Sequence, residues 1–227
     1  MPRSAGCWKG AARAALLAAT LLAVRNDVVE AQLRVGLDVG PILSNLSGSF
    51  IESSSTTSGI YIGAMLEYQF HRKWAVETGF TSLQQGAFNV RVAGFEGEKD
   101  FRTTYIQIPA RLRYLIPFAG DTWVFGPFVG VGLNLGGSCK VRDPGFPIFD
   151  DECSSATPGG PMEKTDFMYS LGFVLDRVFA SSGFGIDARF SQGTKNIFVD
   201  AANQGLTAKN RTFDIKFRMI FPSFGSW

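Results

Sequence analysis

The stretch LRVGLDVG, residues 33–40, decides the fold. Every odd position holds a large apolar side chain, and every even position is charged or glycine. Successive side chains of a β-strand point to opposite faces, so this period of two separates the two kinds of residue. The stretch therefore predicts a strand with one apolar face and one polar face.

Further segments of the chain alternate in the same way. They lie at residues 60–70, 74–81, 106–116, 123–135, 167–176, 184–191 and 213–221. Most approach the ten or so residues that a tilted strand needs to cross a bilayer. An even number of antiparallel strands can close into a barrel without leaving an edge. The sequence thus predicts an all-β fold, an eight-stranded antiparallel up-and-down transmembrane β-barrel.

The connections between these segments alternate in length. Long loops are expected at about residues 44–59, 84–100, 136–164 and 192–210, and short turns separate them. Long outer loops with short periplasmic turns are typical of outer-membrane barrels. With 21 Phe, 26 Gly and 19% charged residues, the composition also suits strands that have one apolar face and one face of small residues.

The N-terminus has the features of a secretory signal peptide. Arg3, Lys9 and Arg13 form a basic region, and residues 14–24 form an apolar segment too short for a membrane helix. Small residues at Val29 and Ala31 suit a cleavage site after Ala31. A short membrane anchor or a frayed N-terminal helix is the alternative.

The chain therefore divides into a signal peptide, residues 1–31, and a barrel domain, residues 32–227. Cleavage would remove four of the 22 basic and two of the 20 acidic residues, which leaves 18 of each. A neutral mature chain gives no electrostatic support for a nucleic-acid partner. We expect a monomer exported to the bacterial outer membrane and in contact with its lipid.

Aromatic residues near the strand ends, such as Trp74 and Trp123, suit membrane interfaces, so we expect the apolar face to contact lipid. The polar face then lines a narrow interior, where equal numbers of acids and bases could pair. The candidate network consists of Arg34, Asp38, Glu67, Glu77, Arg111, Arg113, Asp176, Asp187, Arg189, Asp214, Lys216 and Arg218. We expect this network to plug the barrel. A narrow pore for ions or small solutes is the alternative, and a secreted lipocalin-like carrier with the faces reversed is a remote one.

Two cysteines of the barrel domain, Cys139 and Cys153, lie in one loop. In an oxidising compartment an even pair most simply forms a disulfide. No histidine lies nearby to complete a zinc site. The acidic residues 150–152 could suggest a cation site, but EF-hand spacing is absent and a solvated loop tip is the preferred interpretation.

Nothing in the sequence points to catalysis. The one histidine, His71, is expected in a short turn beside Arg72 and Lys73, at the periplasmic end. Nucleophile-elbow, P-loop and HExxH motifs are absent from the sequence. We expect no enzyme activity, no cofactor, no metal and no catalytic residue.

The segment YIQIPARLRY, residues 105–114, followed by GPFVGVG at 126–132, resembles the PorT-like outer-membrane β-barrel family. The resemblance extends over about residues 32–221. It implies an outer-membrane barrel, in some members linked to protein secretion or similar to small adhesion barrels. It carries over no functional residues. Since Pro109 and Pro127 cannot donate to a ladder, we expect a β-bulge at each.

The last alternating segment, residues 213–221, resembles the C-terminal signal that the barrel-assembly machinery reads. That machinery is therefore an expected partner, beside a surface or periplasmic protein that the sequence does not identify. The function predicted from the sequence is a structural or interaction role in adhesion or envelope assembly.

Overall fold

The computed structural model describes residues 32–145, 151–154, 161–179 and 182–221. The predicted signal peptide and Asp150 of the acidic loop lie outside these described residues. The helices of the described part include none that is long and apolar enough to cross a membrane.

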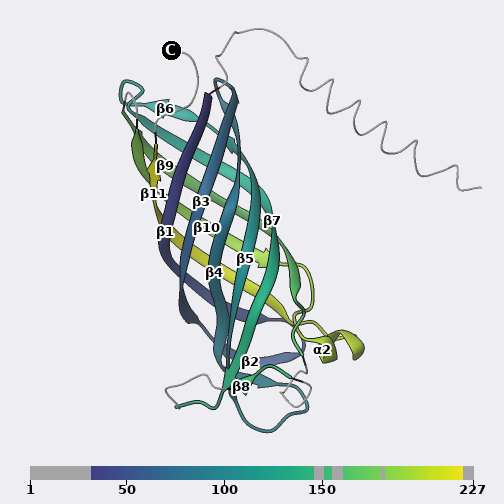
Figure 1. Ribbon diagram of the computed structural model, residues 1–227. Coiled ribbons are helices and arrows are strands. Elements are labelled where there is room, and N and C mark those ends of the chain that lie inside the picture. The colour runs from purple at the N-terminus through teal and green to yellow at the C-terminus, as the bar shows by residue number, and fades with distance from the viewer. Residues whose placement is uncertain (1–31, 146–150, 155–160, 180–181, 222–227) are drawn as a thin grey trace, which may run out of the picture.

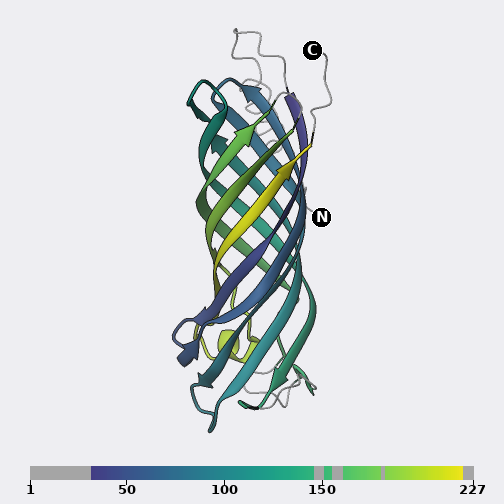
Figure 2. The same ribbon diagram turned by 90° about the vertical axis from the view of Figure 1, so that its left-hand side faces the viewer.

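The fold is a closed, eight-stranded antiparallel β-barrel (Figures 1 and 2). The barrel strands are β1 (Gln32–Ser47), β3 (Thr57–His71), β4 (Trp74–Val92), β5 (Lys99–Tyr114), β7 (Trp123–Arg142), β9 (Thr165–Val178), β10 (Gly183–Gly193) and β11 (Lys209–Ile220). Each strand pairs with the next along the chain, and β11 returns to β1, where Gly36 lies opposite Ile220. The predicted up-and-down barrel is confirmed.

The two ends of the barrel differ in their connections. At one end, which we term the short-turn end, tight turns include the one through His71, and β6 (Ile116–Phe118) pairs with β7. At the other, the long-loop end, lie β2 (Ile51–Ser55), β8 (Asp151–Glu152) and α2 (Val199–Asn203), as Figure 1 shows. This asymmetry is the one that the alternating loop lengths predict.

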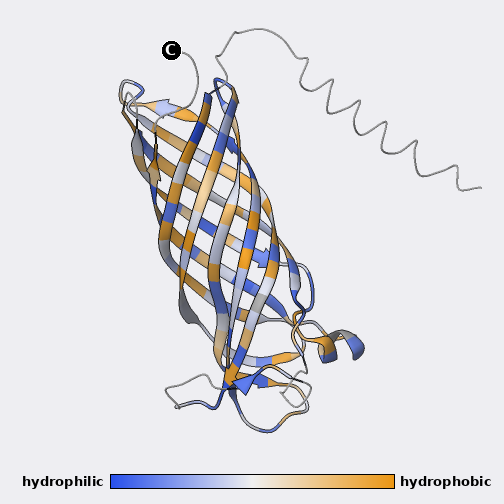
Figure 3. Ribbon diagram, in the orientation of Figure 1, coloured by the Kyte–Doolittle hydropathy of each residue, from blue (hydrophilic) through white to orange (hydrophobic). Residues whose placement is uncertain are grey.

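The outward side chains form an apolar band around the barrel. Along each strand, hydrophobic and hydrophilic residues alternate (Figure 3). Ile62 and Phe80 are 58% and 66% exposed, respectively, whereas their inward neighbours are largely buried. The inverted, lipocalin-like alternative is therefore wrong, because that fold would place its apolar side chains inside.

The strands continue further toward the long-loop end than the sequence predicts. β1 runs to Ser47, β4 to Val92 and β7 to Arg142, so the four expected long loops are too long. The alternation of apolar and polar residues weakens in these extensions, because the outward side chains there are no longer apolar. Backbone pairing nevertheless continues, since it does not depend on what the outward face contacts.

The expected bulges at the two prolines are wrong. The register passes unshifted through Pro109 opposite Gly132, and through Pro127 opposite Phe173. Next to Pro109 the ladder to β4 lacks bridging pairs but keeps its register, and the Thr78 hydroxyl donates to the Pro109 carbonyl at 2.8 Å. The missing N–H of proline thus interrupts the hydrogen-bond ladder, but neither strand gains the extra residue that defines a β-bulge.

Candidate functional site

The twelve charged residues predicted to face inward occupy the lumen on the short-turn side. We call them the charged layer. Arg113, Lys216 and Arg218 are fully buried, and only Arg34, near the short-turn end, keeps appreciable exposure at 18% of its side chain. Ion pairs no longer than 3.8 Å link all twelve residues into one network.

Several ion pairs in the charged layer cross the lumen between strands that are not neighbours. Arg111 of β5 contacts Asp187 of β10 at 2.6 Å, with β7 and β9 between them. Arg218 of β11 contacts Glu77 of β4 at 2.6 Å, with β1 and β3 between them. Charges on opposite walls thus hold each other inside a narrow barrel, where an unpaired charge would cost several kcal/mol.

Arg113 is the central cation of the layer. Its guanidinium donates to the carboxylate of Glu67 on β3 and, at 2.8 Å, to that of Asp176 on β9. Gly126 of β7 makes room for it, because a Cβ at that position would lie 2.8 Å from Nη2 of Arg113. Small residues on one wall therefore accommodate long charged side chains from another.

Toward the long-loop end, the charged layer gives way to neutral polar and aromatic groups. Arg189 donates to the Gln107 side chain at 2.8 Å, and Gln107 donates to Asn134 at 2.7 Å. The ammonium of Lys216 lies 4.4 Å from the ring centroid of Tyr61, close enough for a cation–π interaction. Tyr61 also packs in a small buried apolar cluster that includes Leu83.

A hydrophobic core, which we call the apical core, lies at the long-loop end of the barrel. Its buried members are Leu46, Phe50, Ala87, Val90, Val92, Phe101, Val141, Ile197, Phe198, Ala201 and Ala208. Phe198 precedes α2 and packs against Phe101 and Phe50, with ring centroids 5.1 and 6.2 Å apart. The segment that carries α2 thus packs against residues from β5 and from the turn between β1 and β2.

Sequence reasoning missed the apical core because it assigned these segments to loops. A signal was present in β1, where the inward positions change from Arg34 and Asp38 to Ile42 and Leu46. The period of two continues through the stretch while the polarity of the inward face reverses. An analysis that follows parity alone, without requiring apolar outward residues, would have extended the strand.

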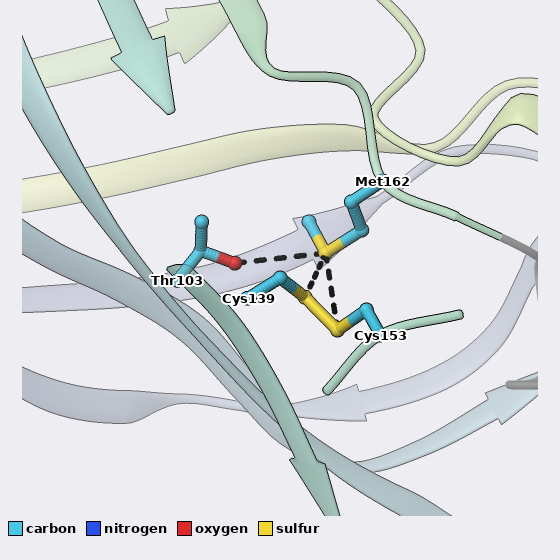
Figure 4. Close-up of a disulfide and its surroundings, with 4 residues drawn as sticks. All are labelled: Thr103, Cys139, Cys153 and Met162. Atoms are coloured by element: carbon cyan, nitrogen blue, oxygen red, sulfur yellow. Dashed lines mark hydrogen bonds between the residues drawn. A yellow bond between two sulfur atoms is a disulfide. The ribbon is translucent and has the colours of Figure 1, made fainter. Parts of the chain in front are cut away.

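The predicted cysteine pair closes a seam beside the apical core. β9 begins opposite Leu135 of β7, so β8 pairs with β7 beyond that point. A disulfide joins Cys139 of β7 to Cys153, which follows β8, and Met162 contacts both sulfurs (Figure 4). A pocket of about 470 Å³ adjoins the disulfide, with Glu152 and Glu163 among its lining residues.

The groups that could suggest metal binding or catalysis do not assemble into such a site in the described part of the chain. Asp38, Glu77 and Asp187 place carboxylate oxygens within 4.8 Å of one another. Arg218 and other bases already contact these three acids, so their negative charge is matched.

The histidine and the acidic loop lie apart from this cluster. His71 is exposed in its turn, where its Nδ1 accepts a hydrogen bond from the backbone N–H of Lys73 at 3.2 Å. Of the acidic loop, Asp151 and Glu152 are exposed on β8.

Comparison with known proteins places the chain among membrane barrels. The family model described as the outer membrane protein beta-barrel domain matches residues 14–221. This match is broader than the PorT-like resemblance, which stays a prediction. No curated protein matches the chain.

Solved structures with a similar fold include three bacterial proteins. Ail, the attachment invasion locus protein of Yersinia pestis, is 17% identical, with a TM-score of 0.45 over 85% of this chain and 100% of that chain. OprG from Pseudomonas aeruginosa is 16% identical, with a TM-score of 0.48 over 87% and 98% of the two chains. Neisserial surface protein A is 13% identical, with a TM-score of 0.46 over 84% and 96%.

Proposed function

Because the chain belongs to the outer membrane protein beta-barrel domain family and is located in the bacterial outer membrane, we propose that it is a closed barrel that presents a rigid long-loop end to a binding partner. In such barrels the long loops face the cell exterior. The role is structural, in adhesion or envelope assembly, and not that of a pore or an enzyme.

The observations that carry this proposal are the ion pairs that cross the lumen and the apolar core at its long-loop end. Ion pairs such as Arg111–Asp187 and Arg218–Glu77 span the charged layer from wall to wall. Toward the long-loop end lies the apical core, whose apolar side chains are buried. An eight-stranded barrel has an interior only wide enough for side chains. A hydrated path for ions would have to break both layers.

The long-loop end has features of a display platform. β4, β5 and β7 extend beyond the apolar band, the disulfide ties β8 to β7, and the α2 segment packs into the apical core through Phe198 and Ala201. A partner that binds such preordered backbone loses little conformational entropy from the barrel protein. The lack of a catalytic constellation among the described residues favours binding over chemistry, and we include the absence of enzyme activity in the proposal.

We further propose that the barrel is a monomer in contact with outer-membrane lipid, and that the assembly machinery recognises β11. Every strand edge of the barrel is paired within one chain, so closure needs no second copy. The outward residues of β11, such as Phe213 and Phe217, give an apolar strand face of the kind that the predicted signal needs.

The closed lumen can be tested by recording ion current across planar bilayers that contain the purified protein. We expect no stepwise conductance from the wild-type barrel. As a control, Asp187→Ala should destabilise the barrel without creating a defined channel, because it leaves Arg111 and Lys216 without a shared partner. Reproducible single-channel steps from folded wild-type protein would refute the closed barrel and favour the narrow pore.

The interaction role calls for a separate test in cells. A strain that lacks the protein should lose adherence to a surface if the role is adhesion, or become sensitive to detergent if the role is envelope assembly. Complementation with a variant in which a Gly-Ser linker replaces residues 196–206 should fail, although the barrel itself is assembled. Full complementation by that variant would contradict a platform at the long-loop end.

A further inference from the structure

A groove on the outer wall of the barrel lies where β10, β11 and β1 run side by side. In Figure 2 the purple β1 and the yellow β11 cross the near face. One outward row on this wall is apolar, with Phe213 between its cross-strand neighbours Leu43 and Phe190. Leu43 and Phe213 are 45% and 42% exposed. This row lies at the edge of the apolar band that faces the long-loop end.

The next outward row changes character within two residues. Arg211 lies between Asn45 of β1 and Gln192 of β10. Its Nε donates to the Gln192 side-chain oxygen at 3.1 Å, which fixes the direction of the guanidinium. Lys209 follows two positions further along the same face, opposite Ser47. A cationic row thus sits directly above an apolar one.

Both rows line one groove of about 200 Å³. Leu43, Phe190 and Phe213 form its apolar part, and Asn45 and Arg211 form its polar part. Thr56, from the segment before β3, contributes a hydroxyl-bearing side. The groove therefore runs across the boundary between the apolar band and the polar surface.

The charge around this groove differs from that on the β4–β5–β7 wall. There, Arg91 pairs with Glu98 at 3.3 Å, Lys99 with Asp143 at 2.5 Å, and the Arg142 side chain with Asp100 at 3.0 Å. Among the described residues, neither Arg211 nor Lys209 forms an ion pair. The positive charge of the groove is thus available to bind an anion from outside the protein.

We propose that this groove binds a phosphate-bearing lipid of the outer leaflet, with the phosphate on Arg211 and an acyl chain along the Leu43–Phe213 row. A guanidinium presents paired donors that match phosphate oxygens, and these charge-assisted bonds are among the strongest in proteins. A soluble anion would gain nothing from the apolar row, whereas a lipid uses both parts of the groove. The site is independent of whether the lumen conducts.

The test uses full-length protein reconstituted in phosphatidylcholine vesicles with a minor fraction of phosphatidic acid. Native mass spectrometry of the released barrel measures how much phosphatidic acid it retains. We expect Arg211→Gln to weaken retention by about tenfold, as the loss of a hydrogen-bonded charge implies. Arg211→Lys should keep part of it. The matched control is Arg91→Gln, which removes a paired arginine from the other wall and should leave retention unchanged.

Equal retention by wild type and Arg211→Gln would overturn the proposal. If that variant fails to fold, as judged by an unchanged gel mobility on boiling, Asn45→Asp gives the same test, because a carboxylate beside Arg211 should displace the phosphate. Inorganic phosphate is the competitor that separates the two sources of the anion. Displacement of the lipid by phosphate at equal concentration would overturn a lipid site, and retention of the lipid under that competition would support it.

Discussion

The two halves of the barrel, built from the same strands, have opposite distributions of apolar and polar side chains. Within the apolar band, outward residues such as Leu37 are apolar and inward residues such as Asp38 are charged. Toward the long-loop end the inward positions are apolar, as at Val90, and the outward ones are polar, as at Arg91. In β1 the period of two continues unbroken through both halves, whereas in β4 a register shift between Ala87 and Val90 changes which positions face inward. In both strands the inward face changes polarity where the outward face leaves the apolar band.

The comparison shows that the environment outside sets what the inside must be. Where lipid covers the wall, apolar residues are satisfied outside and gain nothing more inside, so the lumen can be filled by paired charges. Where water covers the wall, the hydrophobic effect again favours an apolar interior, as in a soluble domain. The same barrel therefore contains the charged layer, as expected within a membrane, and next to it the apical core, as expected in a soluble domain.

The largest effect is expected from reversing a charge inside the charged layer. Arg111→Glu would place a fourth carboxylate beside Glu77, Asp187 and Asp38 and remove the cation that two of them share. Loss of one partner of a buried pair costs about 3–5 kcal/mol, and the added repulsion should bring the loss of unfolding free energy to about 5 kcal/mol or more. Urea unfolding in lipid vesicles, followed by gel mobility, measures it.

Arg91→Glu is the matched control, since it reverses an arginine that is half exposed at the long-loop end. Its effect should be several times smaller. Unchanged stability of Arg111→Glu would mean that the charged layer contributes little to holding the barrel closed. A change in ion selectivity without a change in stability would instead favour the pore.

Truncation in the apical core should cost slightly less and act locally. Phe198→Ala removes a fully buried ring that packs on Phe50 and Phe101. Such a change costs about 3–5 kcal/mol of unfolding free energy. Hydrogen exchange should speed up around α2, while the amides of the charged layer stay protected. A uniform increase over the whole barrel would show that the two halves unfold as one unit.

Removing the disulfide should loosen the seam between β7 and β8. The cysteines are separated by 14 residues, and the chain-entropy account assigns about 3 kcal/mol to a loop of that length. For Cys139→Ser with Cys153→Ser we expect faster exchange at Lys140 and Val141, which pair with β8. Dithiothreitol should reproduce the effect in the wild type and change nothing in the double variant. Identical exchange rates before and after reduction would mean that the backbone pairing of β7 with β8, and not the disulfide, holds this segment in place.

The smallest effect is expected at the exposed pair Arg91–Glu98. These side chains are 52% and 36% exposed and lie 3.3 Å apart. Solvent screening limits such pairs to about 1 kcal/mol or less, so Arg91→Gln should barely change the urea midpoint. Added salt should remove even that difference. A loss comparable to that of Arg111→Glu would erase the distinction between the two halves.

The sequence by itself determined the membrane half of the protein. An eightfold run of period-two segments with alternating loop lengths was enough for strand number, topology and the face that meets lipid. The same parity named the twelve residues that the structure gathers in the lumen, from Arg34 to Arg218. These features are local, because lipid imposes one polarity rule on every strand it touches.

Only the tertiary structure decided which acid meets which base, and where the strands end. Arg113 reaches Glu67 and Asp176 because closure brings β3 and β9 to either side of it, which no spacing along the chain encodes. The apical core likewise depends on residues from five distant segments meeting at one opening. Beyond the apolar band the inward residues are apolar and the outward residues are polar. A search for strands with apolar outward residues therefore ends each strand too early. The end of each strand depends on its neighbours in the closed barrel, and those neighbours exist only after folding.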